Sequence, residues 1–524
     1  MDANEVTACS AVPQRDRRTD QRSARPTSWT LGQRRLSVRS SISSSSVAAG
    51  TLVLALVSCH GGQEGTNTSA STTQDLTPTG SPTSTDGPTT GGEPGICANS
   101  APVAGGPCAP FGVIVAGTNH TCTLLFGGKI RCWGENGVGQ LGLGHVNTVG
   151  DDETPGASPP LDLGEAAIQI AASRYHTCAV TESGRVYCWG SGSFGTLGYA
   201  NTMDIGDDEL PGSSGPVPLN GAALQVVAGN DHTCALMSDG SVRCWGRGEV
   251  GRLGNGSGAD IGDDETPGSQ APIDLGGRAV QLSSSGDHTC AVLEDGGVNC
   301  WGLGDSGQLG RGNTEDIGDD ETPGALGPID VGAAVMEVAT GDFHTCARTV
   351  AGEVRCWGFH GNGELGYGNI EDIGDDENPS EAGAVSVGGA AVAVAARGSS
   401  TCALLDDATL KCWGLGSKGQ LGYGDTNEIG SMNVPSDFGA IEAGGPVAQV
   451  AVGWYHVCAL LVDDSIRCWG NGTEGALGYG NTGTWHTEGS LCYVQEPGSV
   501  CDIAPLCCIG DMPGEMPPPP VQYQ

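Results

Sequence analysis

The residues best suited to hold a metal ion form an acidic motif that recurs at one position of a long internal repeat. The motif reads Gly-Asp-Asp-Glu-x-Pro in five copies, and in four of them a further aspartate precedes it. Carboxylate oxygens are the ligands that Ca²⁺ prefers, and extracellular modules bind this ion at about 10⁻⁴–10⁻³ M. The candidate ligands are Asp151, Asp152, Glu153, Asp204, Asp207, Asp208, Glu209, Asp260, Asp263, Asp264, Glu265, Asp316, Asp319, Asp320, Glu321, Asp372, Asp375, Asp376 and Glu377.

Three interpretations of this motif are open: calcium ligation, a solvated turn, and a docking surface for a basic partner. The spacing is not that of an EF-hand loop. If the repeats close into a ring, all five motifs lie on one rim, where like charges repel one another. The sixth and seventh copies lack the motif, so the sector near Trp485 and His486 is acid-poor and is our candidate for a protein or glycan contact.

Fourteen cysteines form a second regular pattern, in which the two members of each pair stand ten residues apart. Zinc sites prefer pairs separated by two to four residues, so we interpret these pairs as disulfides. Such cysteine usage is typical of an oxidising compartment. The pairs are Cys122 and Cys132, Cys178 and Cys188, Cys234 and Cys244, Cys290 and Cys300, Cys346 and Cys356, Cys402 and Cys412, and Cys458 and Cys468.

The elements that carry both patterns are seven copies of a 56-residue unit without insertions. In residues 224–246, short runs rich in Val, Leu and Thr alternate with Gly and Asp, which predicts strands joined by tight turns. A three-residue hairpin loop that ends at Gly240 sets Cys234 opposite Cys244, at a separation that a disulfide tolerates. Five copies have Gly at this loop position, where the chain is left-handed, and the others have Ala408 and Asp464.

The units also resemble the regulator of chromosome condensation repeat family. The third copy shows the matching residues, HTCALMSDGSVRCWG at 232–246, followed by Gly251, Leu253 and Gly254. The resemblance implies an all-β fold, a seven-bladed β-propeller of four-stranded blades, in which each blade then holds one cross-strand disulfide. Radial closure of seven short-stranded units would also protect the edges of their sheets.

Comparison of the seven copies separates residues that the blade requires from residues that vary. A Trp follows every second cysteine, and we interpret it as packing between blades. A His stands two residues before the first cysteine in six copies, with Ser400 in the sixth, and we interpret it as a buried, hydrogen-bonded residue rather than a metal ligand. Ser306 lies in a protease-like Gly-Asp-Ser-Gly sequence, but its position varies freely among the copies. We assign no catalytic residue.

Closure of the ring is open at this stage. Six linking segments can supply the outer strand of a blade, but the seventh copy runs into a different sequence. Its outer strand must come from residues 503–506, from Val521, or from the stretch before Phe111. We expect Cys97 to pair with Cys108. The four cysteines after the last repeat should form two further bridges of unknown connectivity, namely Cys492, Cys501, Cys507 and Cys508.

The N-terminal region predicts export. Arginines, including Arg34 and Arg35, precede an apolar stretch at residues 47–57 that is too short to span a bilayer, and Cys59 follows. This arrangement resembles a bacterial lipoprotein signal, with cleavage before Cys59 and a lipid on its sulfur. An ordinary secretory signal or a twin-arginine variant is the alternative. The expected segments are a signal at 1–58, a Thr/Ser/Gly/Pro-rich disordered tether at 59–96, the propeller at 97–502 and a Cys/Pro-rich tail at 503–524.

Net charge excludes two classes of partner. The chain carries a formal charge of −38, and because residues 1–58 hold eight arginines and four acids, the remainder is near −42. Nucleic acid and anionic lipid both need a positive surface, so the membrane is reached only through the lipid anchor. We therefore expect a monomeric, non-enzymatic lipoprotein at the outer membrane or cell surface. It would bind an unknown protein or glycan, and Ca²⁺ is its one possible cofactor.

Two alternatives to this function stay open. The chain could be a glycan-active enzyme built on a propeller scaffold, which would require acids or histidines peculiar to one or two copies to converge at the central face. It could also inhibit or regulate another protein, as some relatives of the fold do.

Overall fold

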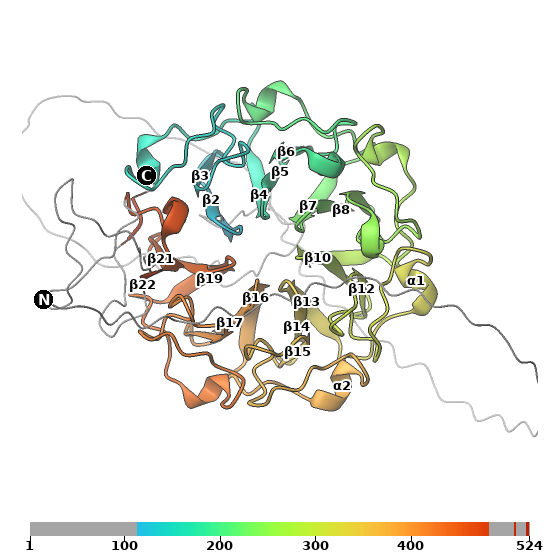
Figure 1. Cartoon of the computed structure of the whole chain (residues 1–524), viewed down its shortest axis with the longest axis vertical. Helices are drawn as coiled ribbons and strands as arrows, with labels where there is room; N and C mark the ends of the chain where they lie inside the picture. Colours follow the sequence, from blue (N-terminus) through green and yellow to red (C-terminus); the bar gives the residue numbers. More distant parts are fainter. Residues whose placement is uncertain (1–112, 481–507, 510–519, 523–524) are drawn as a thin grey trace, which may run out of the picture. The chain divides into compact units, whose positions relative to one another are not determined.

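A computed structural model describes residues 113–480, 508–509 and 520–522. The chain divides into two units, residues 1–93 and 94–524, and every described residue belongs to the second. In it, seven antiparallel sheets are arranged around a common axis as the blades of a propeller (Figure 1). The predicted all-β propeller with one disulfide per blade is confirmed.

Each blade contains three regular strands, numbered from the axis outward. The inner strands are β1 (Val113–Ala116), β4 (Ala167–Ala172), β7 (Ala223–Ala228), β10 (Ala279–Ser285), β13 (Val335–Thr340), β16 (Ala391–Arg397) and β19 (Val447–Val452). The middle strands are β2 (His120–Leu124), β5 (His176–Thr181), β8 (His232–Met237), β11 (His288–Leu293), β14 (His344–Thr349), β17 (Ser400–Leu405) and β20 (His456–Leu461). The third strands are β3 (Ile130–Gly134), β6 (Val186–Gly190), β9 (Val242–Gly246), β12 (Val298–Gly302), β15 (Val354–Gly358), β18 (Leu410–Gly414) and β21 (Ile466–Asn471).

The predicted hairpin register is confirmed. Cys234 lies opposite Cys244, and the same pairing holds in every blade, with the Cα atoms of the two cysteines 4.0–4.1 Å apart. Gly240 closes the hairpin loop at φ 81°. Ala408 and Asp464 take the same left-handed conformation, each at φ 64°, although both carry a Cβ atom. The surrounding ladder therefore fixes this turn even where glycine is absent.

The fourth, outer strand is shorter than predicted. In blade 1, Leu161 pairs with Ile130 through two backbone hydrogen bonds of 2.7 and 3.0 Å, but this is a single-residue bridge and not a strand. Before it reaches this outer position, the chain passes through one short turn of helix in several blades, such as α1 (Pro323–Leu326) and α2 (Pro379–Ala382). Six of the blades are thus three-stranded sheets, and the linking chain is joined to the third strand only by isolated bridges, such as Gly134 with Val149 and Ile130 with Leu161 in blade 1.

Val521 occupies this outer position in blade 7. Its N–H donates to the carbonyl of Ile466 at 2.9 Å, the bond that linking segments make in the other blades, and its side chain is only 4% exposed. The carbonyl of Gln522 accepts from Gly156 of blade 1. Of the three segments considered for closure, the C-terminal one is correct, so part of the predicted tail completes a blade. A two-residue strand, β22 (Cys508–Ile509), also pairs with β21.

The seven tryptophans that follow the cysteines join neighbouring blades, as predicted. Each indole ring is fully buried, and its Nε1–H donates to a backbone carbonyl of the preceding blade at 2.8–3.1 Å. Trp133 donates to Ala476, so this bond also joins blade 1 to blade 7. A buried indole N–H needs a partner, and here the same bond supplies contact between blades.

The six histidines form a second ring of contacts between blades. Each Nε2 lies 2.7–2.9 Å from the Oγ1 of a threonine in the next blade, and His456 reaches Thr121 across the junction of blades 7 and 1. Burial, as the first cause, lowers the pKa of each imidazole from 6.5 to about 3 or 4. The histidines are therefore neutral structural residues, which confirms the interpretation from sequence.

Side-chain amides on the inner strands form a third set of contacts. In four blades a glutamine donates to one backbone carbonyl of the next inner strand and accepts from the N–H of the same residue, at 2.9–3.1 Å. Gln449 makes this pair of hydrogen bonds with Ile114, so blade 7 is joined to blade 1 by the same glutamine contact that joins neighbouring blades elsewhere.

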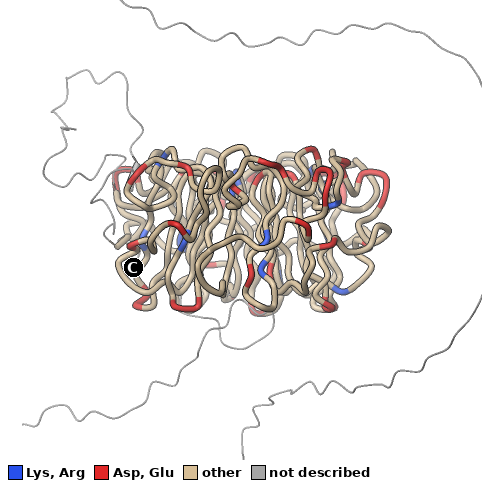
Figure 2. Tube along the Cα trace, turned by 90° about the horizontal axis from the view of Figure 1, so that it is seen from below, with Lys and Arg blue, Asp and Glu red and all other residues tan. Residues whose placement is uncertain are grey.

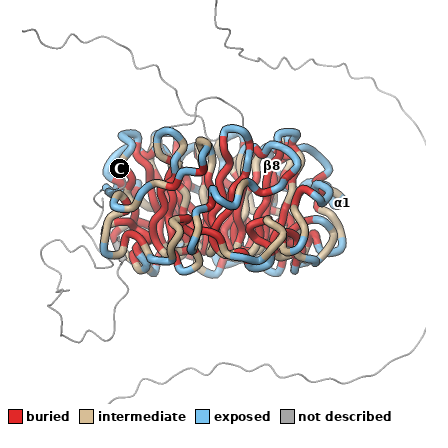
Figure 3. Tube along the Cα trace, turned by 90° about the horizontal axis from the view of Figure 1, so that it is seen from above, coloured by how far each residue is buried: buried red, intermediate tan, exposed pale blue. Residues whose placement is uncertain are grey.

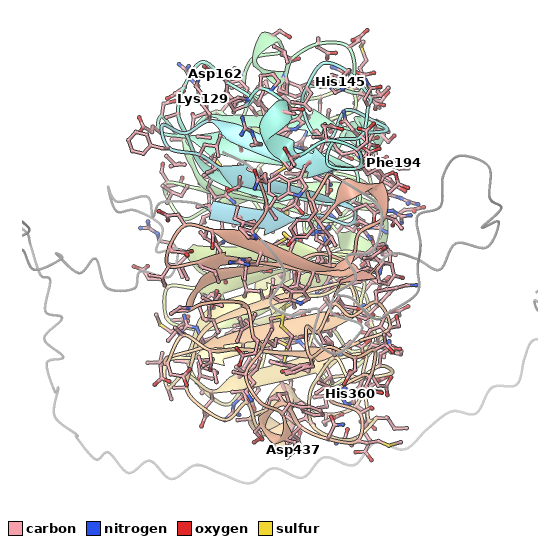
Figure 4. All side chains as sticks on the ribbon, turned by 90° about the vertical axis from the view of Figure 1, so that its left-hand side faces the viewer. Lys129, His145, Asp162, Phe194, His360 and Asp437 are labelled. Atoms are coloured by element: carbon pink, nitrogen blue, oxygen red, sulfur yellow. A yellow bond between two sulfur atoms is a disulfide. The ribbon has the colours of Figure 1, made fainter. Side chains whose placement is uncertain are left out.

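The disc has two faces, which we name by their loops. The turn face carries the seven turns between inner and middle strands, such as residues 117–119, and the loops that follow the third strands. The hairpin face carries the hairpin loops that contain Gly240 and its equivalents. Edge-on, Lys129 and Asp162 lie on the hairpin side, and His145, Phe194 and His360 on the turn side (Figure 4). The strands between the faces are buried, whereas exposed residues lie along both (Figure 3).

Several sequence predictions fall outside the described residues. They concern the signal peptide, Cys59 and the tether. They also concern the pairing of Cys97, Cys108, Cys492, Cys501 and Cys507, and the sector of Trp485 and His486, while Cys508 is described only as part of β22. No helix among the described residues is long and apolar enough to cross a bilayer.

Candidate binding surface

The five acidic motifs each bring three carboxylates together. In every motif, oxygens of the two aspartates and the glutamate lie within 4.8 Å of one another, close enough to share one cation. Acidic residues follow both edges of the disc (Figure 2). The five groups are Asp151 to Glu153, Asp207 to Glu209, Asp263 to Glu265, Asp319 to Glu321, and Asp375 to Glu377.

Crowding alters the acid–base behaviour of these groups. The pKa of the glutamate is raised in all five, first by burial and then by the hydrogen bond and charge of the adjacent aspartates. For Glu321 it rises to about 7. The raised pKa values reflect burial and crowding of the carboxylates, and this contact pattern is compatible with both the calcium and the solvated-turn interpretations.

The preceding aspartates have a different role. Asp204 accepts a hydrogen bond from the backbone N–H of Gly192 at 2.9 Å, and Asp260, Asp316 and Asp372 accept the equivalent bond in their blades at 2.7–2.9 Å. They stabilise the loop after the third strand and do not belong to the three-carboxylate groups. That these four residues also contribute to a metal site stays a prediction.

The series of acidic motifs around the ring is interrupted at blade 6. There the motif is replaced by a loop in which Met432 is 89% exposed and Ser431 donates to Glu428 at 2.6 Å. At blade 1, by contrast, Asp151, Asp152 and Glu153 line an open depression of about 490 Å³ together with His145. The distribution of the acidic motifs around the ring is therefore asymmetric, as predicted from comparison of the copies.

The turn face carries residues that differ from blade to blade on an otherwise repeated framework. The two residues before each middle strand lie outside the histidine, tryptophan and glutamine contacts that recur between blades, and their types vary from blade to blade. The second of these positions holds Asn119, Tyr175, Asp231, Asp287, Phe343, Ser399 and Tyr455. Of these side chains Phe343 is the most exposed, at 44%.

One aromatic and cationic cluster spans the turns of blades 7 and 2. The guanidinium carbon of Arg174 lies 4.8 Å from the ring centre of Tyr175 and 5.4 Å from that of Trp454. The ring of Trp454 in turn stacks on Tyr455, with centres 5.9 Å apart and planes at 20°. All four side chains are partly exposed. We call Arg174, Tyr175, Trp454 and Tyr455 the aromatic–arginine cluster.

Beyond this cluster, the charges of the turn face are largely paired. Arg252 donates to Asp287 at 3.0 Å, and this contact and the charge of the arginine contribute to the lowered pKa of Asp287 despite burial. Arg247 pairs with Asp231 at 3.4 Å while stacking 4.8 Å from the ring centre of Phe194. These pairs fix the side chains, because ion pairs that are partly buried are screened less by solvent.

Arg397 fills the axis beneath the turns. It belongs to blade 6, yet its guanidinium donates to the carbonyl of Ala172 in blade 2 at 2.9 Å, so it spans the centre of the ring. Asp342 faces it from blade 5 and accepts from Ser285 at 3.1 Å. Ala172 lies two residues before Arg174, which sets this second cation close beneath the aromatic–arginine cluster.

The residues assembled here are suited to recognition. Arginine, tryptophan and tyrosine are the residues that most often dominate protein interfaces, and short turns on a rigid base hold them with little loss of entropy on binding. Sequence reasoning missed the cluster, since it examined the invariant histidines and the acidic loops but not the two residues before each histidine. Comparing the copies at those two positions would have revealed it.

Comparisons with known proteins agree with the fold. A family model described as RCC1-like domain matches residues 91–433, and models of the regulator of chromosome condensation repeat match residues 410–460 and 447–476. The Ultraviolet-B receptor UVR8 of Arabidopsis thaliana is 32% identical over 378 residues, which cover 71% of this chain and 79% of the receptor. The mitochondrial RCC1 domain-containing protein RUG3 of the same plant is 30% identical, covering 64% of this chain and 74% of RUG3.

Solved structures show the same architecture. Prp20p of Saccharomyces cerevisiae, whose structure was reported with its binding to Gsp1p and histones, superposes with a TM-score of 0.53 at 22% identity. That match covers 70% of this chain and 83% of Prp20p. At this identity the likeness concerns the fold alone.

Proposed function

Because this chain belongs to the family of proteins with an RCC1-like domain, we propose that it is a non-enzymatic module that binds a protein partner through its turn face. The observation that carries this proposal is the concentration of blade-specific aromatic and charged residues on that face. The histidine and tryptophan contacts recur around the ring, whereas the turn residues change from blade to blade, and only some of them, such as Asp287 and Asp342, make contacts between blades. Prp20p, a propeller with the same architecture, binds proteins.

The physical properties of the turn face support this use. Its large side chains are partly exposed, which costs free energy in an isolated protein unless a partner covers them. The turns are held at their bases by the histidine and glutamine contacts between blades, so little additional ordering is needed on binding. The partner is not a nucleic acid, because a chain with a formal charge of −38 repels polyanions.

We further propose that the protein works outside the cytosol, as a monomer anchored through a lipid on Cys59 at the outer membrane or cell surface. Support comes from the seven disulfides, since thiols are kept reduced in the cytosol. Mass spectrometry of Cys59 and fractionation of the producing cells test this placement. An unmodified thiol in the cytosolic fraction contradicts it.

The binding function is tested by comparing two faces of one protein. The full-length, disulfide-bonded chain is cross-linked to neighbouring proteins, and the linked peptides are identified. The turn-face variant carries Phe343→Asn and Tyr455→Asn, using the asparagine that blade 1 has at the same position. The control variant carries Phe126→Ser on the hairpin face, where Phe126 is 89% exposed and blade 3 has serine.

The expected result is a partner that cross-links to the turn face, is lost from the turn-face variant and is retained by the control. Circular dichroism checks that both variants fold. The proposal fails if the partner contacts the hairpin face. It also fails if the protein turns over a polysaccharide and a turn-face substitution abolishes that turnover.

A further inference from the structure

Arg174 differs from the other arginines of the turn face in what surrounds it. Arg252 and Arg247 each form an ion pair with an aspartate, and Arg397 donates to a backbone carbonyl. Arg174 stacks on two aromatic rings and forms no ion pair with any described carboxylate. Arg174 thus combines stacking on aromatic rings with the absence of an ion pair, which none of these other three arginines does.

The stacking determines which part of Arg174 is available. The guanidinium carbon of Arg174 lies over the rings of Tyr175 and Trp454, and no N–H group of this side chain donates to a described residue, so these groups are available to a ligand. Those groups form a fork that matches two oxygens of a planar anion, and the rings hold the fork in place before a ligand arrives. The partly exposed rings also exclude water from one side of it, which strengthens a charge-assisted bond.

The wider surface limits the size of the anion. Arg397 places a second positive charge below the turns, but Asp342 faces it and reduces its effect. Around the edge of the disc stand five acidic groups, which repel a polyanion. A single carboxylate attached to an otherwise apolar segment satisfies both conditions, because its charge meets the arginine while its apolar neighbours contact Trp454 and Tyr455.

We propose that the aromatic–arginine cluster is a receptor for one carboxylate of a partner polypeptide, with Arg174 as the bidentate donor and Trp454 and Tyr455 as the contact for the adjoining apolar residue. The proposal rests on the proposed binding function and adds the chemistry of the partner. The carboxylate can belong to the C-terminus of a chain or to an Asp or Glu side chain, and the experiment separates these two sources.

The repeat supplies matched substitutions that the fold accepts. Arg174→Asn introduces the residue that blade 3 has at this turn position, Asn230, and Trp454→Thr introduces that of blade 1, Thr118. Arg174→Lys keeps the charge but removes the fork. The control is Arg278→Asn, which makes the same change at an exposed arginine next to the hairpin loop of Gly240.

The first measurement uses the full-length, disulfide-bonded protein with ¹⁵N-labelled arginine. N-acetylleucine, which has a free carboxylate, and its amide are titrated while the Nε–H signal of Arg174 is followed. We expect a saturable shift of this signal with the carboxylate and none with the amide. Binding is then measured to arrays of three classes of heptapeptide: peptides with a free C-terminal carboxylate, peptides with an internal Asp or Glu and an amidated C-terminus, and neutral peptides. Oligouronates and neutral oligosaccharides are tested in parallel.

We expect binding to one carboxylate-bearing peptide format, with at least a tenfold loss in Arg174→Asn and Arg174→Lys, a smaller loss in Trp454→Thr and no change in Arg278→Asn. Binding to neutral peptides only, to oligouronates only, or to carboxylate peptides without dependence on Arg174 overturns the inference, as does no binding at all. If a protein partner is nevertheless lost from the Phe343 and Tyr455 variant, the proposed function stands while the carboxylate receptor is rejected.

Discussion

Replacing His344 by serine should destabilise the protein at neutral pH and at the same time reduce its sensitivity to acid. The His344 ring is 1% exposed, and its Nε2 lies 2.7 Å from Thr401 Oγ1. That hydroxyl donates to the carbonyl of Glu364, so it accepts from Nε2–H and the ring is neutral. Burial first, and then the charges of His288 and His360, lower the pKa of His344 from 6.5 to about 3.

The sign of the pH effect follows from this lowered pKa. Below pH 6.5 the unfolded chain binds a proton at His344 that the folded protein does not bind, so stability present above pH 6.5 is lost as the pH falls toward 3. One pKa unit corresponds to about 1.4 kcal/mol, which gives a loss of about 2 kcal/mol at pH 5 from this ring alone. Any folded pKa below about 4 gives nearly the same figure at that pH.

Serine is a conservative replacement in this fold, because Ser400 occupies the same position in blade 6. His344→Ser removes one buried hydrogen bond and leaves a small cavity, a cost of about 2–3 kcal/mol at pH 7.5. It also removes the titrating ring, so the difference in unfolding free energy between wild type and variant should shrink by about 2 kcal/mol at pH 5. The acidic groups with raised pKa values are present in both proteins and cancel in this difference.

Urea unfolding of the oxidised protein, followed by tryptophan fluorescence at pH 7.5, 6 and 5, measures the effect. The control is Ser400→Ala, which changes the same blade position without removing a titrating group and should give a difference that is constant with pH. A His344→Ser difference that is equal at pH 7.5 and 5 would refute the reasoning. So would an NMR titration in which the folded His344 ring gains its proton near pH 6.5.

Three further predictions concern closure and the acidic edge. Gln449→Ala removes two hydrogen bonds between blades 7 and 1 and should lower the unfolding free energy by about 1–3 kcal/mol. Gln225→Ala removes the equivalent pair between blades 3 and 4 and should lower the unfolding free energy by the same amount. A much smaller loss for Gln449→Ala than for Gln225→Ala argues against a closed ring. Val521→Asp places a charge at a buried position of blade 7 and should cost about 3 kcal/mol or more in the same assay, whereas an unchanged midpoint excludes this closure. Glu321 should titrate near pH 7 when its carboxyl group is followed by ¹³C NMR, and Asp320→Asn should lower that pKa. The calcium interpretation predicts that millimolar Ca²⁺ lowers the pKa of Glu321 in the unsubstituted protein and raises its melting temperature. If neither value changes with the ion, calcium binding is contradicted.

The local structure of a blade could be predicted because it depends on residues close in sequence. The hairpin register follows from the loop that ends at Gly240, and it placed Cys234 opposite Cys244 correctly. Positive φ angles at Ala408 and Asp464 confirm that the repeat, rather than the residue at that position, determines the turn. The buried role of the tryptophans followed from their invariance among the copies, and that of the histidines from their recurrence at one position in six of the seven copies.

Contacts between distant blades could not be predicted in this way. Closure by Val521 depends on a segment that has no counterpart in the repeat, so three segments were equally acceptable from sequence. The contact between Arg174 and Trp454 joins blades 2 and 7, and no pattern along the chain relates the two residues before the ring is built. Asp204 accepts a hydrogen bond from the backbone N–H of Gly192, a contact that its acidic type alone did not reveal, while its role as a metal ligand stays a prediction.

The position of Val521 has a consequence for the order of events during synthesis. Every hairpin, with its cysteines ten residues apart, can form and oxidise as soon as its own segment has emerged, since all its contacts are local. Blade 7 cannot gain its outer segment until residue 521 has been made, well after strand β21. Until then the growing chain carries a row of finished hairpins, and a protein truncated shortly before residue 521 would keep its disulfides. Its strand β21 would pair with β22 at Gly470 and Asn471 but would present the rest of its edge, around Ile466, to other chains.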